Sequence, residues 1–205
     1  MNSLEIVYSR NVVEFVTVAN EYCQAIEQVN RIPATANLQK MQKLLPLLYL
    51  KASLLPQSER VLDEELEKYV SEFDYNVLHQ KWLTLLNEND NFYEVFDPSI
   101  QFGHEAVTAS ISENLLDIYQ DLKNFLVSYS IGNEEVMNDA LVECNEHFVQ
   151  FWGQQVVNVL RAVHMLVYSD VDFGNSEKND TVQPGTGNPK WLDSFWGTDE
   201  DNEDV

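Results

Sequence analysis

The chain has 205 residues, of which 44% are hydrophobic and 11% aromatic, enough apolar material for a substantial core. Its 34 acidic residues against 12 basic ones give a formal net charge of -22, which disfavours binding to nucleic acid or to an anionic membrane, because both require Lys and Arg. The 7 Gly and 6 Pro argue against a loop-rich or all-β protein, and 2 Cys are too few for a disulfide framework.

The start of the chain and its most apolar window argue against export and membrane insertion. The first residues lack a basic segment followed by an apolar run, as a secretory signal would have. The most apolar window, residues 44–55, contains Pro46 and Lys51 and is well short of the ~20 residues that span a bilayer. Cys23 and Cys144 fall at apolar helical positions, which favours buried free thiols in a reducing compartment. We expect a cytoplasmic protein that binds no membrane.

The first part of the chain predicts two long helices. Apolar residues recur at steps of three and four between positions 12 and 29 and again between positions 38 and 55, which places each set on one helix face. Pro46 should kink the second helix, because proline lacks an N–H and crowds the carbonyl four residues back, and Pro56 ends it. The Glu-rich residues 58–70 are expected to form a short, weakly anchored helix.

Two capping sequences predict where further helices begin. Ser71 with Asp74 and Ser110 with Glu113 have the spacing of capping boxes, and an apolar stripe follows each. Gly132 should stop the helix that follows Ser110. Residues 88–109 show no sustained period, and no segment of the chain shows the alternation of a strand.

The last predicted helix covers residues 134–168, with Asn133 as its cap. It would be about 50 Å long at ~1.5 Å per residue if unbroken. The presence of Gly153 inside a helix requires an explanation, because glycine there costs ~1 kcal/mol of stability relative to alanine. The plain reason is the close approach of another helix. The functional one is a bend that shapes a pocket beside Trp152 and Tyr119.

The composition changes after Ser169. Residues 170–205 hold 10 acids and 2 bases, and their Asn, Gly, Ser and Pro content is typical of a linker. We therefore predict an all-α protein in two parts. Residues 1–169 form a bundle of about five to six helices, and residues 170–205 form an acidic, mostly disordered tail.

Several stretches of the sequence, taken together, resemble one known family. They are Glu21-Tyr22-Cys23 with Glu27, residues 44–56, Ser112-Glu113-Asn114-Leu115-Leu116-Asp117-Ile118-Tyr119-Gln120-Asp121-Leu122, and residues 148–164 with Phe151-Trp152-Gly153-Gln154. This combination resembles the DUF5063 family of uncharacterised bacterial proteins over residues 12–168. Leu116 stands where the family pattern has Ala, which keeps the position apolar. The resemblance implies a helical fold and no assigned activity, so it supplies no catalytic residues.

Three carboxylates spaced four residues apart on one helix, Glu113, Asp117 and Asp121, are the strongest candidates for a metal site. All-α nucleotide pyrophosphohydrolases hold Mg²⁺ with Glu and Asp from neighbouring helices, and Glu64 with Glu67 could supply a first Glu-x-x-Glu pair. At about 100° per residue, however, Glu113 and Asp117 point away from the apolar stripe and only Asp121 flanks it. Metal ligands of a bundle usually project inward. We therefore expect a solvated acidic face, with no metal or cofactor.

A second candidate metal site comprises Glu143, Glu146 and His147, of which Glu143 and His147 share one helix face, one turn apart. They lie on the polar face of the last helix, opposite Leu141 and Cys144, so an exposed ion pair between them is the expected arrangement. His164 lies 17 residues beyond His147, about 25 Å along an unbroken helix, and cannot complete a metal site.

The acidic tail contains Trp191, Leu192, Phe195 and Trp196, although aromatic residues are unusual in disordered segments. Their spacing suits a short amphipathic helix that presents its rings on one side. Such a helix could enter a basic or hydrophobic groove of a partner protein, but docking on this protein's own bundle, or no order at all, is the favoured interpretation.

The sequence as a whole favours a non-enzymatic helical interaction or adaptor protein with an acidic surface. A metal-dependent hydrolase that uses Glu113, Asp117 and Asp121 is the first alternative. An acidic mimic of nucleic acid, which would occupy a basic groove on another protein, is the second. The oligomeric state stays open.

Overall fold

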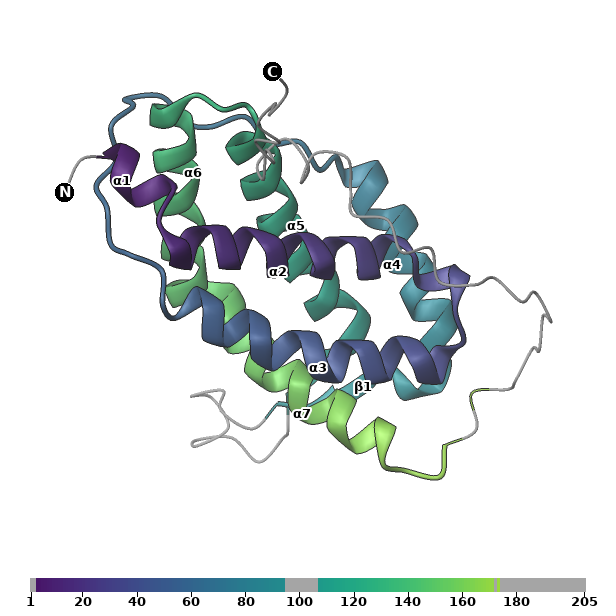
Figure 1. The fold of residues 1–205 in the computed structure, drawn as a ribbon. Coiled ribbons are helices and arrows are strands. Elements are labelled where there is room, and N and C mark those ends of the chain that lie inside the picture. Colours follow the sequence, from purple (N-terminus) through teal and green to yellow (C-terminus); the bar gives the residue numbers. More distant parts are fainter. Residues whose placement is uncertain (1–2, 95–106, 172, 174–205) are drawn as a thin grey trace, which may run out of the picture. The chain divides into compact units, whose positions relative to one another are not determined.

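The computed structural model describes residues 3–94, 107–171 and 173, and these residues are predominantly helical. The helices are α1 (Ser3–Val7), α2 (Arg10–Glu27), α3 (Ala34–Ala52), α4 (Glu72–Leu86), α5 (Ile111–Ser130), α6 (Glu134–His147) and α7 (Gly153–Val167) (Figure 1). Two three-residue strands, β1 (Asn91–Tyr93) and β2 (Thr108–Ser110), lie between α4 and α5. The predicted all-α class is confirmed. Of the tail predicted over residues 170–205, only residues 170, 171 and 173 are described.

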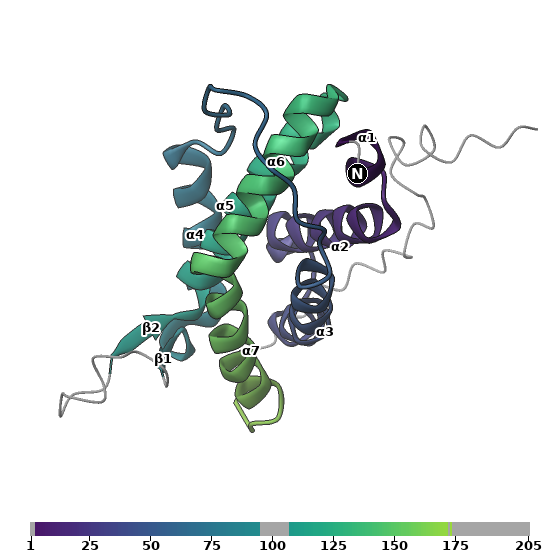
Figure 2. The same ribbon diagram turned by 90° about the vertical axis from the view of Figure 1, so that its left-hand side faces the viewer.

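The helices pack around one apolar core. α2 packs against both α3 and α5, α7 packs against α3 and α5, and α6 packs against α5 and α1. Figure 2 shows α2 and α3 on one side of the long α6–α7 helix and α4 on the other. The largest fully buried side chains come from most of these helices and include Trp82, Trp152, Tyr22, Phe15 and Met41.

The two predicted N-terminal helices are confirmed. The apolar stripe of α2 is buried from Val12 to Ile26. α3 continues through Pro46 and ends at Ala52, before Pro56. Burial of these two stripes against α5 and α7 stabilises both helices more than their intrinsic propensities do.

The helix predicted over residues 58–70 is wrong. Residues 55–71 form an irregular segment, which we call the strap, and it crosses α5 and α6. The N–H groups of Val61 and Leu62 each donate to the Asp139 carboxylate at 2.8 Å. Those of Tyr69 and Val70 donate to Asn124 Oδ1 at 2.7 and 3.1 Å. These buried side chains replace the internal hydrogen bonds that a helix would have supplied.

The predicted helix caps are confirmed. Ser71 accepts a hydrogen bond from the N–H of Asp74, and Ser110 accepts one from the N–H of Glu113. Asn133 caps α6 by accepting from two backbone N–H groups. Gly132 has a φ of 76°, a conformation that glycine adopts without strain and that ends α5.

The predicted last helix is continuous, but it contains a π-helical turn. Phe148–Trp152 forms this turn between α6 and α7, and Gly153 follows it directly. A Cβ at Gly153 would lie 2.4 Å from the carbonyl oxygen of Phe148. Close approach therefore does explain this glycine, but the neighbour is the same helix across the π turn rather than another helix.

A short antiparallel ladder precedes α5, where the sequence showed no strand-like alternation. Its register pairs Asn91 with Ser110 and Tyr93 with Thr108. The buried carboxylate of Asp90 fixes the junction with α5, because it accepts hydrogen bonds from the Ser110 hydroxyl at 2.5 Å and from the Ser112 N–H at 2.8 Å. Side-chain anchoring of this kind orders strands too short to show a period of two.

Two predictions about buried and membrane-spanning segments can also be compared with the fold. Cys23 and Cys144 are buried free thiols, as predicted, and burial raises the pKa of both. Among the described residues, no helix combines the length and the apolar composition needed to cross a bilayer.

Candidate functional site

The polar side of α5 faces α4, the strap and the α6–α7 helix. Asp117 accepts a hydrogen bond from Tyr75 of α4 at 2.7 Å and another from Gln155 of α7 at 2.8 Å. Asp121, one turn further on, forms a hydrogen bond of 2.8 Å with Nδ1 of His147. The predicted solvated face is therefore wrong for Asp117 and Asp121, because helices pack on both sides of α5. Glu113 is exposed, as expected.

The Asp121–His147 pair is largely buried, and this burial shifts the pKa of Asp121. The two side chains are only 26% and 33% exposed. Desolvation raises the pKa of Asp121, and the hydrogen bond and charge of His147 oppose that rise. The pair joins α5 to the end of α6, at the point where the π turn begins.

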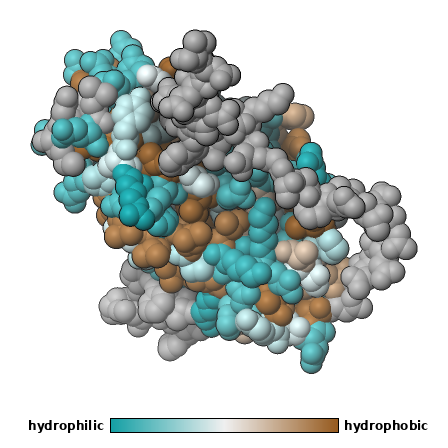
Figure 3. Space-filling view, viewed as in Figure 1, coloured by the Kyte–Doolittle hydropathy of each residue, from teal (hydrophilic) through white to brown (hydrophobic). Residues whose placement is uncertain are grey.

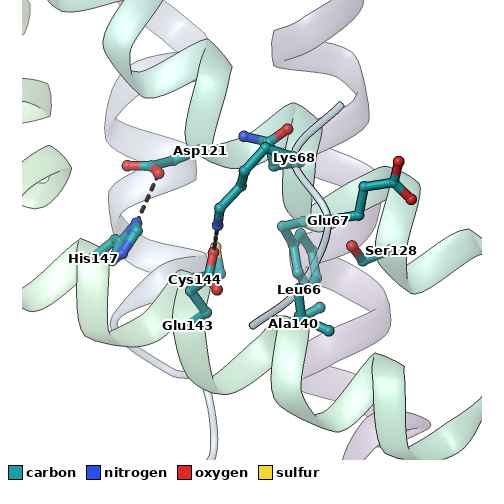
Figure 4. A pocket seen from close by; sticks show the side chains of 11 residues that line it. Leu66, Glu67, Lys68, Asp121, Ser128, Ala140, Glu143, Cys144 and His147 are labelled. Carbon is teal, nitrogen blue, oxygen red and sulfur yellow. Dashed lines mark hydrogen bonds and ion pairs between the residues drawn. The ribbon is translucent and has the colours of Figure 1, made fainter. Parts of the chain in front are cut away.

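The predicted ion pair between Glu143 and His147 is wrong. Glu143 instead binds Lys68 of the strap and lies 3.9 Å from Arg60, while His147 turns to Asp121. Figure 4 shows the two pairs side by side, with Lys68 reaching across to Glu143. The sequence did not reveal this exchange of partners, because the strap brings two cations to a face that was expected to be open.

The space between these pairs is very small. The cavity that Asp121, Glu143, Cys144 and His147 help to line has a volume of about 10 Å³. That is about the space that one water molecule needs. Glu67 of the strap lines the same cavity, whereas Glu64 does not. This arrangement holds the strap and two helices together, and it leaves no room for a substrate inside the pocket.

The candidate metal ligands do not converge. Among the described residues, no three His, Cys, Asp or Glu side chains come together in a way that could hold a metal ion. Asp117 and Asp121 face different partners, and Glu113 has no part in either contact. His164 is far from His147 and lies 3.4 Å from the Gln42 side chain.

Tyr119 and Trp152 do not share a pocket. Trp152 is fully buried and donates to the Cys144 carbonyl at 3.2 Å. Tyr119 lines a separate cavity of about 380 Å³ between α4 and α5, where its hydroxyl donates to Glu27 at 2.9 Å. Lys123 binds the same carboxylate at 2.7 Å, so Glu27 already has two partners.

Several important polar residues were not singled out in the sequence. Asn124, Asn138 and Asp139 are buried and bind the strap. A polar residue of this type at a buried helical position was the signal that could have revealed them, since buried polar groups require partners. The predicted interaction residues Trp191, Phe195 and Trp196 lie outside the described residues.

Comparisons with known proteins agree with this fold. No curated protein matches the chain. The crystal structure of protein BF1032 from Bacteroides fragilis is similar, with 41% sequence identity, a TM-score of 0.71, and coverage of 80% of this chain and 96% of that one. Residues 6–169 match the family described as domain of unknown function (DUF5063). The resemblance suggested by the sequence is thereby confirmed, and the chain belongs to the DUF5063 family.

Proposed function

We propose that this protein is a non-enzymatic interaction or adaptor protein of the bacterial cytoplasm. The observation that supports this most is the role in the fold of three carboxylates that were candidate metal ligands. Asp117, Asp121 and Glu143 each bind a side chain that fixes a neighbouring helix or the strap. Because these polar groups stabilise the fold, we expect the surface of the protein to carry its function.

The acidic sequence at the C-terminal end supplies one contact of this proposed adaptor. Trp191, Phe195 and Trp196 offer rings, and residues 199–204 add five carboxylates that would steer them towards a basic rim. A partner with a basic or hydrophobic groove suits this combination.

The experiment compares the full chain with a variant that lacks residues 170–205. A matched control keeps the length and every acid but replaces the three aromatic residues with Ser. The proposal expects both variants to lose the same co-purifying proteins while the melting temperature stays unchanged. A lower melting temperature with unchanged partners would instead mean that the aromatic residues serve the stability of their own chain.

The metal-dependent hydrolase is tested by the melting temperature with and without millimolar Mg²⁺ or Mn²⁺. An ion that binds only the native state raises the melting temperature. The proposal expects no marked change. A clear rise that Asp117→Asn or Asp121→Asn abolishes, and that the exposed control Glu135→Gln preserves, would favour the hydrolase.

A further inference from the structure

Two stretches without Asp or Glu pack against each other in this acidic protein. Residues 28–58 and 147–169 together carry five Lys or Arg and no acid, in a chain with 34 acidic residues. The first stretch contains α3, and the second contains the π turn and α7. α3 and α7 form an extensive helix–helix contact (Figures 1 and 2). The fold thus gathers on one side two helices that contribute no negative charge.

A groove lies along α7, and Gln42 is the residue that α3 contributes to it. It has a volume of about 570 Å³, within the range of binding sites in proteins. Its lining residues, which define the α3–α7 groove, are Gln42, Val157, Leu160, Arg161, His164 and Met165. Val157 and Met165 are 42% and 61% exposed, so apolar surface in the groove faces solvent.

The outer side of α3 extends this apolar surface. Leu47 and Leu50 of α3 and Leu54, two residues beyond its end, are 40%, 52% and 45% exposed, and we call these three the leucine row. Figure 3 shows hydrophobic atoms gathered over the C-terminal half of α3. Single exposed leucines are ordinary on a protein surface, whereas a contiguous exposed apolar patch indicates an interaction site.

The charged side chain that lines the groove is that of Arg161, which also donates to the Tyr93 carbonyl at 3.4 Å, while Glu94 approaches α7 one turn away, at Asn158. Glu14 lies 2.5 Å from Lys51 and 2.7 Å from Arg10. The negative charge of this acid, near the C-terminal end of α3, is therefore neutralised by two cations. Arg161 and Lys43 form no ion pair with any carboxylate that the structure describes. These two cations would attract a negatively charged ligand to the groove and its edge.

We propose that the α3–α7 groove binds an acidic amphipathic helix of a partner protein. The apolar edge of that helix would cover Met165 and the leucine row, and its acidic side would pair with Arg161 and Lys43. This inference rests on the proposed adaptor function and adds to it a second contact, with chemistry opposite to that of the acidic tail.

A helix fits this surface better than a membrane or a nucleic acid does. The groove lies where α3 and α7 pack together and exposes apolar side chains, and an apolar groove is the kind of surface that an amphipathic helix recognises. An anionic bilayer or a nucleic acid extends far beyond the groove and would meet the remaining surface of a protein with net charge -22. A single helix is about 10–12 Å wide with its side chains, close to the screening length of about 8–10 Å, so local cations outweigh distant acids.

Two designed peptides separate the groove from the overall charge. Both are 18-residue helices with the same leucine stripe; one carries Glu on its flanks and the other carries Lys. Binding to the full chain is measured by fluorescence anisotropy at physiological salt. The net charge alone predicts tighter binding of the Lys peptide. The groove predicts that the Glu peptide binds about tenfold tighter than the Lys peptide.

Variants then locate the binding. Met165→Glu should abolish binding of the Glu peptide, and Arg161→Glu should reverse the preference, while the control Phe73→Glu on α4 should change neither. Phe73 is 75% exposed and thus tolerates a charge. Equal or tighter binding of the Lys peptide to the unaltered chain would overturn the proposal, as would a Glu peptide insensitive to both groove variants.

Crosslinking in cells identifies the natural occupant. A photoreactive amino acid at position 165 should link to a partner segment that is acidic and has the apolar spacing of a helix. Links to residues 174–205 of this chain, to a second copy or to lipid would overturn the proposal. If position 165 gives no protein link but the tail deletion still removes partners, the groove proposal fails and the adaptor proposal stands.

Discussion

The sharpest test of the architecture is the substitution Asp139→Ala in α6. Asp139 is 1% exposed, and its carboxylate accepts hydrogen bonds from the backbone N–H groups of Val61 and Leu62. It also accepts one from the Asn138 side chain at 3.0 Å. Alanine would remove the acceptor from all three donors without adding bulk to the core.

The expected loss of stability follows from these contacts. A hydrogen bond to a charged group contributes about 1.5–3 kcal/mol, and two strap amides lose theirs together. Some of this is regained because Val61 is 51% exposed and its amide can reach water in the variant. We expect Asp139→Ala to lower the free energy of unfolding by about 3–4 kcal/mol, and Asp139→Asn, which keeps one acceptor oxygen, by about half as much.

Urea denaturation and amide hydrogen exchange measure the two parts of this effect. In the unaltered protein the amides of Val61 and Leu62 should exchange slowly, and in Asp139→Ala they should exchange at nearly the rate of an open chain. Glu135→Ala is the control, because Glu135 is exposed on the same helix and should cost only a few tenths of a kcal/mol. A change below about 1 kcal/mol in Asp139→Ala, with the amides still protected, would refute the role of this carboxylate.

Two further substitutions test other parts of the fold. Gly153→Ala should lower the melting temperature despite the higher helix propensity of alanine, because its Cβ would lie 2.4 Å from the Phe148 carbonyl; an unchanged or raised value would contradict this account of the π turn. Tyr129 donates to the Val7 carbonyl at 2.6 Å, and burial raises its pKa to about 12 from the usual 10.0. The raised pKa contributes its full stabilisation below pH 10.0, and this contribution is lost as the pH rises towards about 12. The urea midpoint of the unaltered protein should therefore fall between these pH values. It should fall less steeply in Tyr129→Phe, which has no hydroxyl to ionise. Equal slopes for the two proteins would contradict the assignment.

Local interactions explain which parts of the fold the sequence predicted. The caps at Ser71, Ser110 and Asn133 act within three residues, and the apolar stripes repeat within one or two helical turns. Such signals can be read from one short window of sequence. The helices and most of their boundaries therefore could be predicted without knowledge of their neighbours.

Long-range contacts explain which predictions were wrong. The segment 58–70 has the composition of a helix, but its amides bind side chains that lie 54 to 78 residues further along the chain. Asp117 points away from its own apolar stripe, yet α4 and α7 cover it from both sides. Helical angles give the direction of a side chain and do not reveal which other helices lie there.

The strap also constrains the order in which the chain can fold during synthesis. Its residues leave the ribosome before α5 and α6 exist, whereas its amide acceptors, Asn124 and Asp139, belong to those two helices. Forming such contacts requires closing a long loop, which is slow relative to forming a helix. We therefore expect the strap to be the last of the described segments to become protected in a nascent chain, after α5 and α6 have paired.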